Sequence, residues 1–222
     1  MFPTADPRIV PASAAPARRK WWRLPRILGI GATLFWAFAV GAGIERVWRY
    51  ESTPGATAIG PQVWPVASRI EHRQGEPTLV MFVHPRCPCS RASLTELREI
   101  MARTGGHLHA HVLFLRPQGT DDVWERTPTW KAAQNIAGVT VSVDRDGAEA
   151  ARFGATTSGH TVLYGPQGQL LFAGGITAAR GHEGDNAGRQ SLLALLKHKT
   201  ADSAHQVYGC TLSDRVPQRD GA

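Results

Sequence analysis

Two cysteines separated by a single proline carry the most specific chemical signal in the sequence. Cys87 and Cys89 lie in the segment HPRCPCSR, directly after an apolar run and directly before a helical pattern. The N-terminus of a helix carries partial positive charge and free N–H groups, which stabilise a thiolate and lower its pKa. Arg86, Arg91 and His84 add positive potential. We therefore expect a reactive thiolate at Cys87, the more exposed thiol, with Cys89 half a turn inside the helix.

The spacing of apolar residues predicts the elements that position these thiols. Residues 78–84 form a continuous apolar run, which is typical of a buried strand, and a helical face over 90–103 ends at Gly105-Gly106. The remaining expected elements are strands at 112–115 and 139–143, helices at 129–136, 146–153 and 186–199, and a hairpin of 161–164 with 169–172. The resulting order, β-α-β-α-β-α-β-β-α, predicts an α/β fold closed by a hairpin.

Four segments resemble the thioredoxin-like superfamily over about residues 63–210. They are FVHPRCPCSR, VSVDRDGAEAARFGA, GHTVLYGPQGQLLFAGG and GGITAARGHEGDNAG. The resemblance is to membrane-anchored, periplasmic proteins of the TlpA/ResA kind, and within them it is nearest to the RedB-type group. It implies a thioredoxin-like fold and thiol–disulfide oxidoreductase activity.

The chain departs from the usual members of this superfamily in two ways. The family motif is C-x-x-C, but Ser90 occupies the place of its second cysteine, and the extra thiol is Cys89. The family places a cis-proline just before the first hairpin strand, where this chain has His160. The resemblance therefore carries Cys87 over as the nucleophile and leaves the resolving thiol open. Cys89 can close a small, strained and easily reduced disulfide, and Cys210 is the second candidate if the tail folds back.

Other residues near the motif receive auxiliary roles. Ser90 is expected to hydrogen-bond the Cys87 thiolate, and His84 or His160 to move protons. The polar segment 180–186 either shapes access to the thiols or is a loop whose last residue, Asn186, caps a helix. The competing interpretation of Cys210 is an ordinary cysteine of the tail.

A metal site is the principal alternative to redox chemistry. Two thiolates and an imidazole are soft ligands suited to Cu(I), so Cys87, Cys89 and His160 are a candidate ligand set. Copper-delivery members of the superfamily use two more widely spaced cysteines and a histidine before a comparable hairpin. His160 is otherwise a structural or substrate-contacting residue, and no further cofactor is expected. A third hypothesis is a non-catalytic assembly factor that keeps the fold for protein binding.

The first fifty residues predict a membrane anchor. Residues 27–44 contain no charge, and as a helix of ~1.5 Å per residue they span roughly 27 Å, close to the hydrocarbon thickness of a bilayer. Five cationic residues between Arg18 and Arg26 precede this stretch, and Trp21, Trp22, Trp48 and Tyr50 flank it. The positive-inside rule places the N-terminus in the cytoplasm and the rest outside. The alternative is a signal peptide cleaved near Ala37-Phe38-Ala39.

Charge and composition exclude several classes of function. The net charge is +7, but residues 1–50 carry +6 and residues 51–222 only +1, which argues against a nucleic-acid-binding domain. A hydrophobic content of 42% excludes wholesale disorder, and three cysteines exclude a disulfide-rich scaffold.

These observations combine into one prediction. We expect a single-pass protein of the bacterial inner membrane that exchanges disulfides with protein thiols on the periplasmic side and binds no nucleic acid. Its parts are a cytoplasmic N-terminus at 1–26, a membrane helix at 27–47, a tether at 48–67, a thioredoxin-like domain at 68–200 and a tail with Cys210 at 201–222.

Overall fold

The N-terminal third of the chain is dominated by one long helix. The computed structural model describes residues 23–56 and 60–212, and the chain divides into two compact units between Arg46 and Val47. Helix α1 (Arg23–Ser52) is, within these described ranges, the one helix long and apolar enough to cross a membrane. Its side chains from Leu28 onward are exposed. The basic residues expected in the cytoplasm lie largely at 1–22, outside the described residues.

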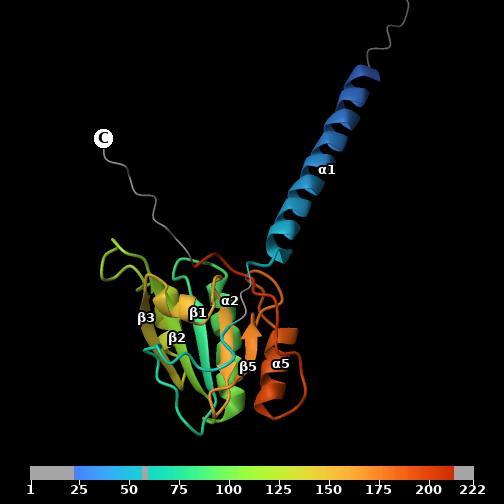
Figure 1. Ribbon diagram of the computed structural model, residues 1–222. Coiled ribbons are helices and arrows are strands. Elements are labelled where there is room, and N and C mark those ends of the chain that lie inside the picture. Colours follow the sequence, from blue (N-terminus) through green and yellow to red (C-terminus); the bar gives the residue numbers. More distant parts are fainter. Residues whose placement is uncertain (1–22, 57–59, 213–222) are drawn as a thin grey trace, which may run out of the picture. The chain divides into compact units, whose positions relative to one another are not determined.

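A mixed five-stranded sheet forms the centre of the second unit (Figure 1). Its strands are β1 (Thr78–Val83), β2 (His109–Arg116), β3 (Val139–Arg145), β4 (His160–Tyr164) and β5 (Leu170–Gly174), in the spatial order β3-β2-β1-β4-β5. Strands β1, β2 and β3 are parallel, whereas β4 is antiparallel to both β1 and β5. This arrangement is a thioredoxin-like fold, as the sequence predicts.

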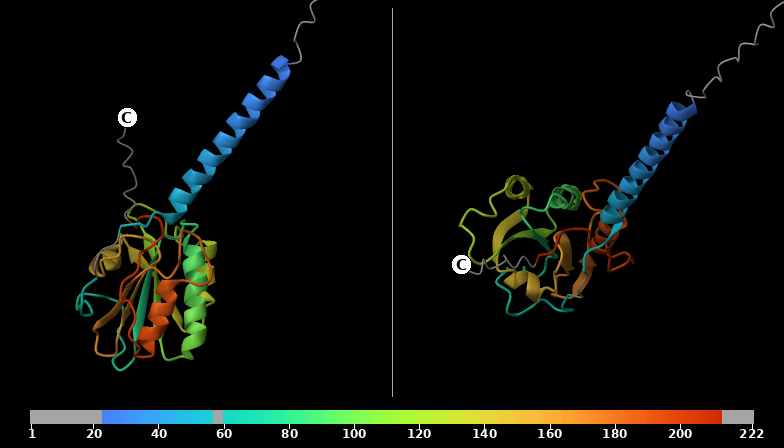
Figure 2. Two further views of the ribbon diagram at one scale, coloured as in Figure 1. Left: turned by 90° about the vertical axis from the view of Figure 1, so that its right-hand side faces the viewer. Right: turned by 90° about the horizontal axis from the view of Figure 1, so that it is seen from above.

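Two apolar cores lie on the two faces of the sheet, because successive strand residues point to opposite sides. Met81 of β1 contributes to one core and Phe82 to the other. The helices of this unit are α2 (Ser90–Thr104), α3 (Pro128–Gln134), α4 (Ala148–Arg152) and α5 (Ala187–Leu196). Helices α2, α3 and α5 cover the first core, where α2 and α5 lie side by side (Figure 2), and α4 covers the second.

The predicted elements all occur, and their ends differ for local reasons. Helix α4 starts two residues later than expected because Asp146 and Gly147 adopt left-handed backbone conformations, with φ of 56° and 66°. The carboxylate of Asp144 accepts the N–H groups of Glu149 (2.8 Å) and Ala150 (2.9 Å) in its first turn. Helix α5 ends at Leu196 rather than at 199, since His198 adopts a left-handed backbone conformation with φ of 54°.

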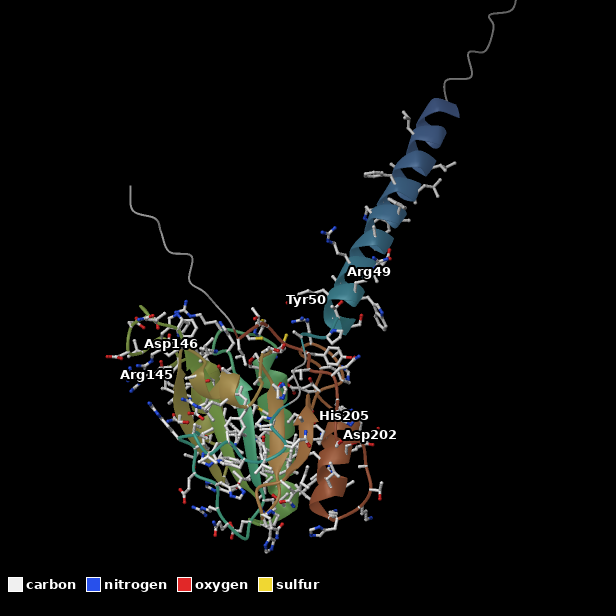
Figure 3. All side chains as sticks on the ribbon, viewed as in Figure 1. Arg49, Tyr50, Arg145, Asp146, Asp202 and His205 are labelled. Carbon is white, nitrogen blue, oxygen red and sulfur yellow. The ribbon has the colours of Figure 1, made fainter. Side chains whose placement is uncertain are left out.

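The chain after α5 returns across the domain as a segment that we call the C-terminal strap, residues 203–212. It starts beside β5, where Ala173 N–H donates to Ser203 O (2.8 Å). The ring of His205, labelled in Figure 3, stacks on Phe172 (centroids 5.7 Å apart) and reaches the Ser191 hydroxyl of α5 (2.9 Å). The strap then continues toward the start of β4, where Leu212 N–H donates to Thr156 O (2.9 Å).

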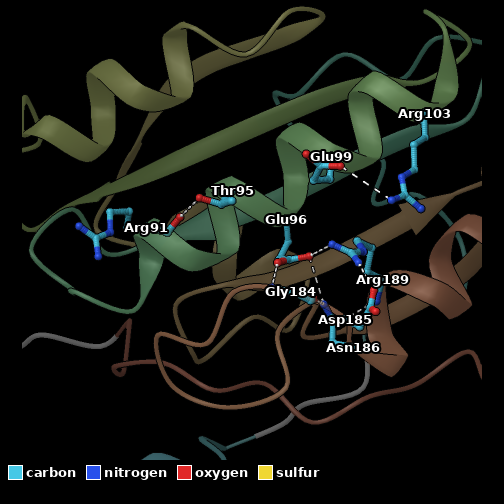
Figure 4. Close-up of polar contacts among 9 residues, drawn as sticks. All are labelled: Arg91, Thr95, Glu96, Glu99, Arg103, Gly184, Asp185, Asn186 and Arg189. Carbon is cyan, nitrogen blue, oxygen red and sulfur yellow. Dashed lines mark hydrogen bonds and ion pairs between the residues drawn. The ribbon is translucent and has the colours of Figure 1, made fainter.

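A buried carboxylate joins α2 to the start of α5. Glu96 exposes only 1% of its surface and accepts hydrogen bonds from Gly184 N–H (2.7 Å), the Asn186 amide (3.2 Å) and the Arg189 guanidinium (Figure 4). Arg189 also pairs with Asp185 (2.8 Å). Asn186 caps α5, as predicted, by accepting Arg189 N–H (2.7 Å). One carboxylate thus fixes the helix that follows the cysteine motif against the loop before α5.

Replacing this carboxylate tests its structural role. Glu96→Ala leaves the Arg189 cation buried with only its exposed partner Asp185, so we expect the free energy of unfolding to fall by about 3 kcal/mol. The matched control is Glu99→Ala on the exposed side of the same helix, which should change stability by no more than about 0.5 kcal/mol. Urea denaturation of the detergent-solubilised full chain measures both values. Equal losses in the two variants would contradict the assignment.

Candidate functional site

The cysteine motif forms a tight turn between β1 and α2. Cys87 N–H donates to His84 O (3.0 Å), and Ser90 N–H donates to Cys87 O (3.2 Å). Cys89 occupies the N-cap position of α2, and the helix starts at Ser90. The motif therefore lies at the carboxyl end of a central strand, as the sequence predicts.

Both motif thiols are buried, and the expectation that Cys87 is the more exposed one is wrong. Cys87 exposes 2% of its surface and Cys89 6%. The C-terminal strap contributes to the burial of Cys87, because it places Cys210 beside the Cys87 thiol. Cys210 itself is only partly buried, and all three cysteines are free thiols in this structure.

The pKa of the Cys87 thiol is lowered, as the sequence predicts, with the Ser90 hydroxyl among the causes as expected and Cys210 in place of the two arginines. Burial opposes ionisation, but hydrogen bonds from the thiol and the N–H of Cys210, the Ser90 hydroxyl and the Cys89 N–H together outweigh it. The two flanking arginines make other contacts. Arg86 lies 4.8 Å above the ring of Trp124, and the exposed side chain of Arg91 approaches Glu183 (3.9 Å).

The pKa values of the other two thiols move in the opposite direction. Burial raises the pKa of Cys89, and the neighbouring Cys87 raises it further, against the opposing charge and hydrogen bond of Arg180. Burial, together with the hydrogen bond and charge of Cys87, raises the pKa of Cys210 to about 12. Cys87 is thus the one thiol of the three whose environment favours the thiolate.

A buried serine that the sequence analysis did not single out connects the parts of this site. Ser158 accepts His84 N–H (2.8 Å) at its hydroxyl, shares a second hydrogen bond with the Ser90 hydroxyl (2.9 Å), and donates its N–H to Cys210 O (2.8 Å). Its one sequence signal is its place directly before Gly159-His160, where the family has its cis-proline loop. No cis peptide bond occurs within the described residues.

Arg180 is the residue of segment 180–186 that reaches the thiols. Its guanidinium contacts Cys89, donates to Gly209 O of the strap and lies 4.9 Å above the ring of Tyr50. The other end of the segment supplies the cap of α5. One end of the segment therefore contacts the thiols through Arg180, and the other end is a loop in which Asn186 caps a helix.

The two histidines occupy different environments. His84 accepts Arg86 N–H at Nδ1 (3.2 Å) and contacts Trp124 edge-on (centroids 5.5 Å apart), so it belongs to the motif turn. His160 lies on the same face of β4 as Val162 and Tyr164, which belong to the core on the side of the sheet opposite α2. Burial lowers the pKa of His160 to about 4, so the ring is neutral at pH 7, and neither ring nitrogen has a hydrogen-bond partner among the described residues.

The proposed copper ligands do not fit a common site. Within residues 23–56 and 60–212, no group of three or more His, Cys, Asp or Glu side chains is arranged to hold a metal ion. Instead, His160 lines a cavity of about 390 Å³ with residues of β5 and the C-terminal strap. The structure brings together Cys87, Cys89, Ser90, His84 and Cys210, and it leaves His160 outside this group.

Comparison with known proteins gives the fold and no closer relationship. No protein-family model and no curated protein sequence matches the chain. A hypothetical protein from Sinorhizobium meliloti 1021 has a similar structure (17% identity, TM-score 0.53, covering 72% of this chain and 94% of that one). An uncharacterized conserved protein from Geobacillus kaustophilus is comparable (13% identity, TM-score 0.53, 73% and 92% covered). At these identities the likeness shows the fold alone.

A third structure is that of a disulfide oxidoreductase, and its match is weaker. It is a secreted Mycobacterium tuberculosis disulfide oxidoreductase homologous to Escherichia coli DsbE, with 18% identity, a TM-score of 0.40, and 56% of this chain and 83% of that one covered. A match at this level carries no argument about function. The nearer resemblance to TlpA/ResA-like and RedB-type proteins rests on sequence motifs alone.

Proposed function

We propose that this chain is a membrane-anchored, extracytoplasmic protein that exchanges disulfides with partner proteins, with Cys87 as the attacking thiol. The observation that carries the proposal is that the pKa values of three neighbouring thiols are shifted in opposite directions. Hydrogen bonds converge on Cys87 and lower its pKa, while the pKa values of Cys89 and Cys210 are raised. Such a separation assigns one group as the thiolate nucleophile and keeps protonated thiols beside it.

The chemistry follows from these positions. The Cys87 thiolate attacks one sulfur of a partner disulfide and forms a mixed disulfide, while the other partner sulfur leaves as a thiolate and takes up a proton. The Ser90 hydroxyl stabilises the Cys87 thiolate before the attack. A second thiol of the chain then attacks Cys87 and releases the partner. Since Cys87 is 2% exposed, the covering residues must move before a protein partner reaches it.

The copper hypothesis is weaker because its third ligand is missing. Cys87 and Cys89 remain a pair of soft ligands, but His160 shares a face of β4 with Val162 and Tyr164, which belong to the core opposite α2. The assembly-factor hypothesis requires no reactive thiol, so it does not account for the lowered pKa of Cys87. Neither a copper carrier nor an assembly factor is expected to accelerate insulin reduction, so this reaction separates them from disulfide exchange.

Insulin reduction by the detergent-solubilised full chain tests the activity. We expect the parent chain to accelerate the reaction and Cys87→Ser to lower the rate at least tenfold, to the background, because the attacking thiolate is lost. Thr95→Ala, on the exposed side of α2, is the matched control and should keep the parent rate. An inactive parent chain would overturn the proposal. Stoichiometric Cu(I), lost equally in Cys87→Ser and Cys89→Ser, would then favour the copper carrier.

The same proposal keeps α1 as a permanent anchor, with residues 1–26 in the cytoplasm. A C-terminally tagged chain should therefore sediment with membranes and resist carbonate extraction. Placing arginine at Leu34 and Phe38 should release it, since each charge at the centre of a membrane helix costs about 3 kcal/mol. A soluble tagged species that begins near Val40 would show that the segment is a cleaved signal.

A further inference from the structure

The C-terminal strap holds Cys210 at a defined position beside Cys87. Ser158 N–H donates to Cys210 O (2.8 Å), and Leu212 N–H donates to Thr156 O (2.9 Å) two residues along. These bonds flank an antiparallel bridge between Thr157 and Thr211. The strap is therefore a short added strand on the segment that precedes β4, and Cys210 occupies a fixed place in its register.

The approach of the strap is close enough to require glycine. A Cβ atom added at Gly209 would lie 1.9 Å from the carbonyl oxygen of Ser158. The Arg180 guanidinium also binds Gly209 O, and Val207, which is 1% exposed, accepts Gly55 N–H (2.8 Å). Hydrogen bonds and packing on both sides of Cys210 thus hold this part of the strap against the domain.

We propose that Cys210 is the thiol that resolves mixed disulfides at Cys87, so that the oxidised protein carries a Cys87–Cys210 disulfide. This proposal rests on the proposed function. The thiol and the N–H of Cys210 both lie close enough to the Cys87 sulfur to stabilise its thiolate. The contact joins the motif turn to the strap, and Ser158 already binds both through the Ser90 hydroxyl (2.9 Å) and Cys210 O (2.8 Å).

Cys89 is less suited to this step. A Cys87–Cys89 disulfide spans one residue inside the turn that Ser90 N–H and Cys87 O close, and such small rings are strained and easily reduced. Ala92 N–H also donates to Cys89 O (3.1 Å) as the first turn of α2 forms. Arg180 engages the Cys89 thiol, which gives this cysteine a partner of its own.

The resolving step balances in atoms and electrons. Cys210 loses its proton and attacks the Cys87 sulfur, the bond between Cys87 and the partner breaks, and the partner sulfur leaves and accepts the proton. In total, one partner disulfide is reduced to two thiols, and the Cys87 and Cys210 thiols are oxidised to one disulfide. The part of the raised Cys210 pKa that comes from the charge of Cys87 disappears once the mixed disulfide forms.

Oxidised glutathione is a probe that separates the two candidate resolving thiols. The reduced full chain in detergent is treated with it, free thiols are blocked, and tryptic peptides are examined by mass spectrometry. We expect peptide 87–91 linked to peptide 200–215 in both the parent and Cys89→Ser. The Cys87–glutathione adduct should accumulate at least fivefold more in Cys210→Ser than in Cys89→Ser, because only the former lacks the resolving thiol.

Gly209→Ala provides a second variant in which all three cysteines remain. Its added methyl group displaces the strap from Ser158, so the 87–91 to 200–215 link should fall at least fivefold. Gly41→Ala in α1, where an added Cβ meets no atom within 4 Å, is the control and should keep the parent level.

Adduct accumulation in Cys89→Ser but not in Cys210→Ser, or an internal disulfide in peptide 87–91 of the parent, would overturn the assignment of Cys210. Absence of any adduct at Cys87 in all variants would instead overturn the proposed function.

Discussion

Ser158, in the segment before β4, binds both the motif turn and the C-terminal strap beside the thiols. Its hydroxyl binds the backbone of His84 at the end of β1 and the hydroxyl of Ser90 at the start of α2, and its N–H binds Cys210 O in the strap. Ser158 is 2% exposed, so removing its hydroxyl from the closed site would leave the His84 N–H and the Ser90 hydroxyl without this partner and without water in its place. The lowered pKa of Cys87 depends on this arrangement, because the donors that surround the sulfur come from both the motif turn (Cys89 and Ser90) and the strap (Cys210).

The rest of the domain keeps these segments in place. Strand β1 pairs in parallel with β2 and antiparallel with β4. The antiparallel pairing places the end of β1, which leads into the motif turn, beside the start of β4, which follows Ser158. Helix α2 is locked by Glu96 to the loop before α5, and the strap is locked by its bonds to β5. The charge of Arg180 acts on the pKa values of Cys89 and Cys210. The three thiols therefore have different surroundings although they are chemically identical.

The sequence predicts the local features of this architecture well. Apolar runs of the right length identified β1 and the α2 region, Gly105 marked the end of α2 with a φ of 58°, and Asn186 marked the start of α5. These signals work because they depend on residues within a few positions of one another. The location of Cys87 and Cys89 at a strand–helix junction follows from the same local pattern.

The contacts that define the site depend on chain segments far apart in the sequence, and these were not predictable in the same way. The burial of Cys87 results from the returning strap, and the role of Ser158 requires three segments to meet. The resemblance to thioredoxin-like proteins predicts His160 near the thiols, whereas the two-residue period of β4 places it on the same face as Val162. Arg86 and Arg91 have the expected sign of charge, but their side chains contact Trp124 and Glu183 instead of the thiols.

Hydrogen-bond donors from the motif turn and from the strap together lower the pKa of Cys87. The most direct test is the rate of iodoacetamide alkylation at each cysteine as a function of pH, in the parent chain and in Cys210→Ser. The account predicts that Cys87 titrates below the pKa of ~8.5 of a free thiol, and that its pKa rises when Cys210 is replaced. It would be contradicted if Cys210 were alkylated first at neutral pH, or if the Cys87 pKa were the same in both proteins.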